Sequence, residues 1–201
     1  MDVGFLLDVS GSMQEGNLVK EIDFMTKLVE KYEVGEDAVK FATVVFSSRP
    51  TVKFDFNRYD TKDEILEAVR GITYPPRGWT NTHEGLRAFR TKVFTAAGGQ
   101  RPGVPRVLLL MTDGNANSKD RTSAEAKLIK DMGIDLFVIG FGTTIDVAQL
   151  RRLASKKGDG FYDGDFDKLT DVIEDLASKT CEGKPQCSMI YQLVGRICVL
   201  Y

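Results

Sequence analysis

The sequence predicts an α/β fold: a doubly wound, mostly parallel six-stranded sheet with one antiparallel edge strand and helices on both faces, in a Rossmann-like arrangement. Two observations lead to this prediction. Strand-like and helix-like segments alternate along most of the 201 residues, which is the order that builds a parallel sheet with crossover helices. Most of the expected strands are also nearly continuous apolar runs, as strands buried on both faces of a sheet are.

The N-terminal half begins with a strand and then a helix. Residues 3–7 form an apolar run and predict a buried strand. Apolar residues then recur at helical spacing from Leu18 to Tyr32, with Ile22 among them, and predict the first helix. Residues 51–56 alternate between apolar and polar after a Ser-Ser-Arg-Pro turn, so we expect an antiparallel edge strand there. The remaining elements of this half are a strand at 41–46 and helices at 63–69 and 86–94.

The C-terminal half continues the alternation. Residues 107–111 are the most apolar of the expected strands, and a helix at 123–132 leads into another strand at 134–140. The last expected elements are a helix at 147–154, a small strand at 160–162 and a helix at 166–177. We therefore expect one domain over residues 1–180, followed by a tail at 181–201.

Composition limits the classes of partner and compartment. The formal net charge of −2 gives no electrostatic reason to expect nucleic acid or an anionic membrane, and no apolar run reaches the roughly 18 residues that a membrane-spanning helix needs. The three cysteines, Cys181, Cys187 and Cys198, all lie in the tail. This placement favours an exported module, extracellular or part of an ectodomain, while three free thiols in a cytosolic protein remain the alternative.

Oxygen-bearing side chains follow the first strand and return in two later loops. Asp8, Ser10 and Ser12 come directly after the apolar run 3–7. Thr80 ends a Pro-Pro loop, and Asp113 follows the strand at 107–111. Ligands of open α/β sheets bind beyond the carboxyl ends of the strands, so we expect these five side chains to lie together. Two carboxylates with three hydroxyls suit Mg²⁺, with Mn²⁺ or Ca²⁺ as alternatives, and the lack of Cys and His ligands argues against zinc.

The ordered set Asp-x-Ser-x-Ser, Gly-x-Thr-x-Thr and Thr-Asp-Gly resembles the metal-ion-dependent adhesion site of the von Willebrand factor A domain family. The resemblance covers residues 2 to about 180, and the segment 155–169 is similar to the end of extracellular A domains of the matrilin and collagen type. It implies that Asp8, Ser10, Ser12, Thr80 and Asp113 coordinate the metal. It also implies that the helix at 166–177 is an element that slides between two states.

What the resemblance implies about function is a non-enzymatic, metal-dependent adhesion module. The metal would coordinate an Asp or Glu carboxylate of a protein ligand, such as collagen or another matrix protein, without nucleic acid or membrane insertion. Specificity in this family lies in the loops around the metal, which here carry Arg77, Trp79, Asn81, His83, Asn115 and Asn117.

Two alternative functions remain open. One is an intracellular A domain that acts as a scaffold in a multiprotein assembly. The other is a magnesium-dependent phosphatase, because Asp8 follows a first buried strand, as the nucleophile of haloacid-dehalogenase-type enzymes does. Such an enzyme needs a second acid two residues later, where this chain has Ser10, so we expect no catalytic residue.

Overall fold

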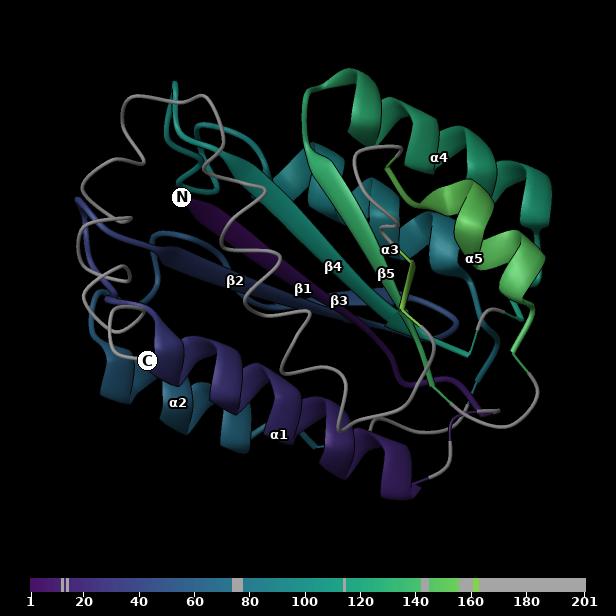
Figure 1. Ribbon diagram of the computed structural model, residues 1–201, viewed down its shortest axis with the longest axis horizontal. Helices are drawn as coiled ribbons and strands as arrows, with labels where there is room; N and C mark the ends of the chain where they lie inside the picture. The colour runs from purple at the N-terminus through teal and green to yellow at the C-terminus, as the bar shows by residue number, and fades with distance from the viewer. Residues whose placement is uncertain are drawn as a thin grey trace, which may run out of the picture.

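The computed structural model describes residues 1–155 and 161–162, except 12, 14, 74–77, 114 and 142–144. These residues form one twisted sheet with helices on both of its faces (Figure 1). The strands lie in the order β3-β2-β1-β4-β5-β6. Their bounds are Asp2–Asp8 for β1, Lys40–Phe46 for β2, Pro50–Phe54 for β3, Arg106–Thr112 for β4, Asp135–Gly140 for β5 and Phe161–Tyr162 for β6.

The strand pairing confirms a mostly parallel sheet with one antiparallel strand. β1 lies in the middle and pairs in parallel with both β2 and β4, while β3 pairs antiparallel with β2 at the edge. β5 continues the parallel arrangement beside β4, and β6 adds a two-residue pairing beyond it. Every residue of β1 and β2 is buried, as expected for apolar strands covered on both faces.

The helices divide between the two faces. Figure 1 shows α1 and α2 on one face and α3, α4 and α5 on the other. Their bounds are Glu15–Lys31 for α1, Lys62–Arg70 for α2, Thr82–Ala88 for α3, Lys119–Asp131 for α4 and Val147–Leu153 for α5. The single helix predicted at 86–94 is in fact the end of α3 followed by a π-helical turn at Phe89–Val93. The helix expected at 166–177 and the cysteine-bearing tail lie outside the described residues.

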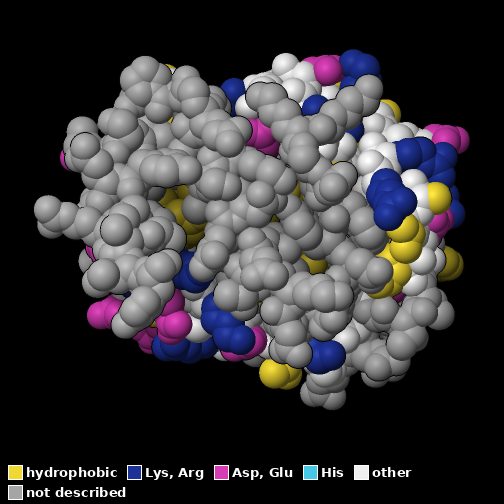
Figure 2. All heavy atoms as spheres, in the orientation of Figure 1, with side chains coloured by type: hydrophobic (Ala, Val, Ile, Leu, Met, Phe, Trp, Pro, Cys, Tyr) yellow, Lys and Arg dark blue, Asp and Glu magenta, His cyan; other side chains and the backbone are white. Residues whose placement is uncertain are grey.

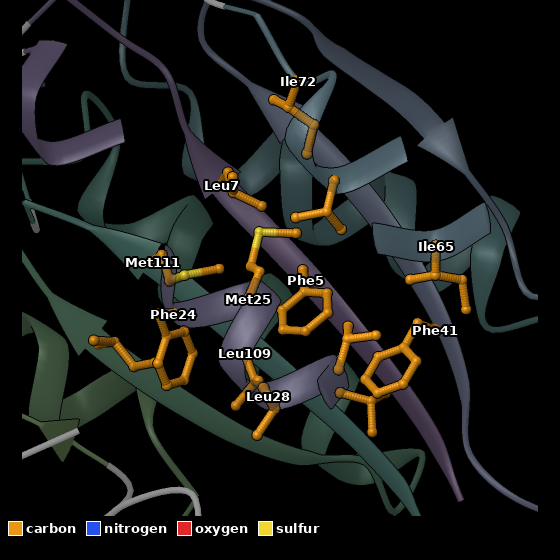
Figure 3. Close-up of a cluster of buried hydrophobic side chains, with 14 of the residues drawn as sticks. Phe5, Leu7, Phe24, Met25, Leu28, Phe41, Ile65, Ile72, Leu109 and Met111 are labelled. Atoms are coloured by element: carbon orange, nitrogen blue, oxygen red, sulfur yellow. The ribbon is translucent and has the colours of Figure 1, made fainter. Parts of the chain in front are cut away.

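Two hydrophobic clusters hold the layers together. The cluster between the sheet and α1–α2 is shown in Figure 3, where Met25 and Leu28 of α1 face Phe5 and Leu7 of β1. A second cluster, on the opposite face, joins Leu108 and other strand residues to α3, α4 and α5. The two clusters fix both sides of β1 and β4 and thereby set the position of the loops that follow these strands.

The loops after β1, β4 and β5 leave the same edge of the sheet, because the three strands are parallel. None of the described helices is long and apolar enough to cross a membrane. In the space-filling view, Lys and Arg side chains gather over α4 and α5, and acidic side chains lie among them on the described part of this face (Figure 2). The elements that matter for function are therefore the ends of β1 and β4 and the loop before α3.

Candidate metal centre

Asp8 is the last residue of the central strand, and it is fully buried. Its Oδ1 accepts a hydrogen bond from the backbone N–H of Ser10 at 3.0 Å. Its Oδ2 accepts one from the hydroxyl of Thr112, the last residue of β4, at 2.6 Å. Leu7 pairs with Met111 in the register of the two strands, which brings Thr112 and Asp113 beside Asp8. The neighbouring strand ends thus fix the orientation of this carboxylate.

Burial raises the pKa of Asp8 to about 6, although hydrogen bonds from Ser10 and Thr112 lower it, and the negative charge of Asp113 adds to the rise. No described Lys, Arg or His forms an ion pair with Asp8 or Asp113. A buried carboxylate without a cationic partner is costly. Two neighbouring carboxylates in this condition fit a site that is completed by a cation from solution.

Ser10 and Thr80 lie together although 70 residues separate them. The hydroxyl of Thr80 donates a hydrogen bond to Ser10 Oγ at 2.9 Å, and both residues are buried. Gly11 lies beside the same loop, because its N–H donates to the carbonyl of Gly78 at 3.1 Å. A Cβ atom at Gly78 would lie 2.5 Å from Ser48 Oγ, so a larger residue there would have to displace the Ser48 hydroxyl, which accepts the backbone N–H of Trp79.

Asn117 holds Thr80 in place from the loop after β4. The backbone N–H of Thr80 donates to Asn117 Oδ1, and the backbone N–H of Asn117 donates to the carbonyl of Thr80 at 3.0 Å. Asp113 lies in the same loop and is 4% exposed, with Oδ1 accepting the backbone N–H of Asn115 at 3.0 Å. The structure therefore brings Asp8, Ser10, Thr80 and Asp113 to one edge of the sheet, while Ser12 lies outside the described residues.

The donor set fits a hard divalent cation. Carboxylate and hydroxyl oxygens are the ligand types that Mg²⁺, Mn²⁺ and Ca²⁺ take, and Mg²⁺ keeps several waters in such sites. Two carboxylates balance a double positive charge, and the hydroxyls of Ser10 and Thr80 add donors without adding charge. The described residues contain no cluster of three or more His, Cys, Asp or Glu side chains suited to a metal.

The residues predicted to contact a ligand differ in their accessibility. Trp79 is 69% exposed, and its backbone N–H donates to Ser48 Oγ at 2.9 Å. Asn81 is half-buried and uses its side chain to donate to the carbonyl of Ser48 at 3.0 Å, so it stabilises the loop. Asn115 and Asn117 are exposed beside Asp113. His83 Nε2 lies 3.6 Å from Glu84 Oε1 on α3, and Arg77 lies outside the described residues.

Two residues near this centre escape detection from the sequence. In the sequence, nothing distinguishes Thr112 from an ordinary strand residue, and its contact with Asp8 depends on the pairing of β1 with β4. Glu21 is fully buried on α1, although the sequence pattern places the neighbouring Ile22 on the apolar face. The signal available for Glu21 was its spacing of three residues from Leu18 and four from Met25.

Comparisons with known proteins agree with this geometry. The profile of the von Willebrand factor type A domain matches residues 2–175. Matrilin-1 of Gallus gallus is 32% identical over 189 residues, which cover 93% of this chain and 38% of matrilin-1. The collagen alpha-6(VI) chain of Homo sapiens is 32% identical over 194 residues, covering 94% of this chain and 8% of the collagen chain. The chain thus spans less than half the length of these relatives.

Solved structures show the same fold. One is proximal thread matrix protein 1 from the mussel byssus, whose metal-ion-dependent adhesion site (MIDAS) motif is occupied by zinc. It superposes with a TM-score of 0.75 at 31% identity, covering 87% of this chain and 44% of that chain. The manganese-loaded TRAP protein of Plasmodium vivax superposes with a TM-score of 0.74 at 24% identity, covering 86% and 71%, and shows the fold alone. The matched profile and the sheet topology agree: the chain belongs to the von Willebrand factor type A domain family.

Proposed function

We propose that the chain is a cation-dependent protein-binding module. Asp8, Ser10, Ser12, Thr80 and Asp113 would hold Mg²⁺, with Mn²⁺ or Ca²⁺ as alternatives, and the cation would bind an Asp or Glu carboxylate of a protein partner. The observation that carries this proposal is the convergence of Asp8 and Asp113, two carboxylates without a described basic partner, with the hydroxyl pair Ser10–Thr80. The zinc-occupied MIDAS motif of the byssal relative supports a metal at this position.

The charge of the site favours an acidic partner. A cation bound by two carboxylates and neutral hydroxyls has no excess negative charge in its immediate ligand set, so another carboxylate can replace a bound water. A third carboxylate among the direct ligands would repel that group. The cation therefore supplies the bond to the partner, and the protein residues hold the cation and leave a coordination position accessible.

The surrounding loops are the proposed source of selectivity. Trp79 is an exposed aromatic side chain one residue before Thr80, and aromatic residues often dominate binding energy at interfaces. Asn115 is exposed two residues after Asp113. We propose that these two side chains contact the partner directly. Asn81 and Asn117 act mainly on the loop that carries Thr80, because their side chains bond to protein groups.

The proposed location is extracellular, with a matrix protein as partner. The supporting observations are the matches to a collagen chain and to a thread matrix protein, together with the cysteines at the C-terminal end of the sequence. A thiol titration under denaturing, non-reducing conditions tests the compartment. Three free thiols would favour the intracellular scaffold, whereas fewer would favour the exported module.

The binding proposal is tested in two stages with the full chain. Calorimetric titration of the EDTA-treated and dialysed chain with MgCl₂ or MnCl₂ is expected to give one binding site. A pull-down against matrix proteins, including collagens, is then expected to retain a partner in Mg²⁺ and to lose it in EDTA. The key variant is Asp113→Asn, and the matched control is Asp120→Asn, which removes the same charge from an exposed position on α4.

Asp113→Asn is expected to weaken cation binding at least 10-fold and to abolish capture of the partner, whereas Asp120→Asn leaves both unchanged. Capture that is indifferent to EDTA and to Asp113→Asn would refute the metal-bridged mechanism. Turnover of a phosphate ester that depends on Asp8 would instead support the phosphatase, which the position of Ser10 argues against.

A further inference from the structure

Glu21 interrupts the apolar face of α1. Leu18, Met25 and Leu28 are buried against the sheet, and Glu21 occupies the same face at helical spacing from them. Its side chain is fully buried, with an exposed fraction of 0%. An acidic residue is rarely fully buried without a partner, so this position needs a physical explanation.

The carboxylate of Glu21 has no hydrogen-bond partner in the part of the chain that the structure describes. Neither Oε1 nor Oε2 accepts a hydrogen bond from any described residue. No described Lys or Arg pairs with it; the ion pairs of α1 involve Asp23 and Glu30, which face solvent. A buried carboxylate in this state destabilises the fold, and a hydrophobic residue would pack at the same place without that cost.

The fold places Glu21 toward the end of the sheet that carries the candidate metal centre, where the charges of Asp8 and Asp113 act on it. Figure 3 shows Met25 beside Leu7, and Leu7 directly precedes Asp8. Glu21 lies one helical turn before Met25, in the N-terminal half of α1. Figure 1 shows that the N-terminal end of α1 lies toward the ends of β1 and β4. The pKa of Glu21 lies well above its ordinary value, because of burial first and then because of the negative charges of Asp8 and Asp113.

We propose that Glu21 is a positioning residue of the cation site, which accepts hydrogen bonds from water bound to the cation. The inference rests on the proposed function, because it needs a cation held by Asp8 and Asp113. Direct coordination is not supported, since no three acidic side chains among the described residues are grouped closely enough to hold a metal. Contact through water fits both the unpartnered oxygens and the preference of Mg²⁺ for retaining water.

This role explains why a carboxylate occupies an apolar face. Residues outside the direct ligand set orient bound water and ligands, and their loss typically lowers metal affinity 10- to 100-fold. Glu21 also links α1 to the cation, because the same helix packs through Met25 and Leu28 on the central strand. Without the cation, burial and the negative charges of Asp8 and Asp113 disfavour the ionised form of Glu21, and the fold bears the cost.

Two substitutions at Glu21 and one control test the inference. Glu21→Gln keeps the shape and removes the charge, while Glu21→Leu removes all hydrogen-bonding capacity and suits the apolar face. Glu30→Gln is the matched control, because it removes one charge from an exposed position of the same helix. The measurements are the dissociation constant for Mg²⁺ by calorimetry and the thermal midpoint in EDTA.

Glu21→Gln is expected to raise the dissociation constant for Mg²⁺ about 10- to 100-fold, and Glu30→Gln to leave it unchanged. Glu21→Leu is expected to weaken cation binding at least as much, while its midpoint in EDTA rises above that of the unsubstituted chain. Equal Mg²⁺ affinity in the unsubstituted chain and in both Glu21 variants would overturn the inference and leave a packing role only. Failure of the unsubstituted chain to bind any cation would instead refute the proposed function.

Discussion

Lowering the pH from 7 to 5 is expected to stabilise the cation-free chain, the reverse of ordinary acid destabilisation. The cause is Asp8, whose pKa rises from 3.8 to about 6 on folding because the carboxyl is buried. Between these values the folded chain keeps a proton that the unfolded chain has released. The stabilisation is therefore fully present below about pH 4 and is lost as the pH rises through about 6.

The size of the effect follows from the shift. One pKa unit corresponds to about 1.4 kcal/mol, so the shift of Asp8 is worth about 3 kcal/mol over the whole range, of which about 1 kcal/mol falls between pH 7 and 5. For a chain of this length, that change moves the thermal midpoint by about 3 °C. Glu21 acts in the same direction, because its pKa is also raised. Glu36 and Glu64, whose pKa values are lowered, titrate below this window.

The assay is thermal unfolding at pH 7, 6 and 5, in EDTA and in excess MgCl₂. Protons compete with the cation for Asp8, so the stabilisation by Mg²⁺ should shrink as the pH falls, and the two curves should converge. In the cation-free chain, Asp8→Asn should remove the part of the pH dependence of the thermal midpoint that comes from Asp8. A cation-free midpoint that falls steadily from pH 7 to 5, with a constant increment from Mg²⁺, would refute this reasoning.

Three further substitutions separate stability from binding. Arg101→Ala removes the ion pair to buried Asp2, at 2.6 Å, and is expected to cost about 3 kcal/mol in urea unfolding while Mg²⁺ affinity stays unchanged. Trp79→Ala, at an exposed position, is expected to change the unfolding free energy by less than about 0.5 kcal/mol and to weaken partner capture without changing calorimetric Mg²⁺ binding. Asn117→Ala removes the side-chain acceptor that holds Thr80. The Mg²⁺ affinity measured by calorimetry should therefore fall, while the thermal midpoint in EDTA should change little.

The sequence predicts the fold well where pattern and burial agree. The apolar runs that become β1 and β4 are buried on both faces, and nothing in them competes with a strand assignment. Asp8 and Asp113 follow these strands, so their proximity follows from the parallel topology. The π-helical turn at Phe89–Val93 was not predictable from the sequence. Phe89 and Val93 are four residues apart, and this spacing of apolar residues is also the one expected for an ordinary α-helix.

The contacts between distant residues were beyond the sequence pattern. The hydrogen bond from Thr112 to Asp8 depends on the register of β1 and β4. The reciprocal hydrogen bonds between Thr80 and Asn117 depend on the packing of two loops, one before α3 and one after β4. Glu21 was missed for another reason: a charged residue in an amphipathic helix normally faces solvent, and Ile22 beside it appeared to fill the apolar position. The orientation of α1 on the sheet shows that Glu21 lies inside, on the face that its spacing from Leu18 and Met25 indicates.

Cation affinity and partner affinity place opposite demands on the charge of this centre. Asp8 and Asp113 would already balance a divalent cation, and Glu21, once ionised beside the bound cation, would add negative charge that strengthens the hold on it. The same charge opposes an incoming carboxylate of the partner. At a distance that admits water, the repulsion is weaker than it would be from a direct ligand, because water screens it. A carboxylate on α1, rather than a third acid beside Ser10, therefore tightens the cation site at the smallest cost in attraction for an acidic partner. It follows that Glu21→Gln should be judged on the two affinities separately, since partner binding at saturating cation can improve while cation binding weakens.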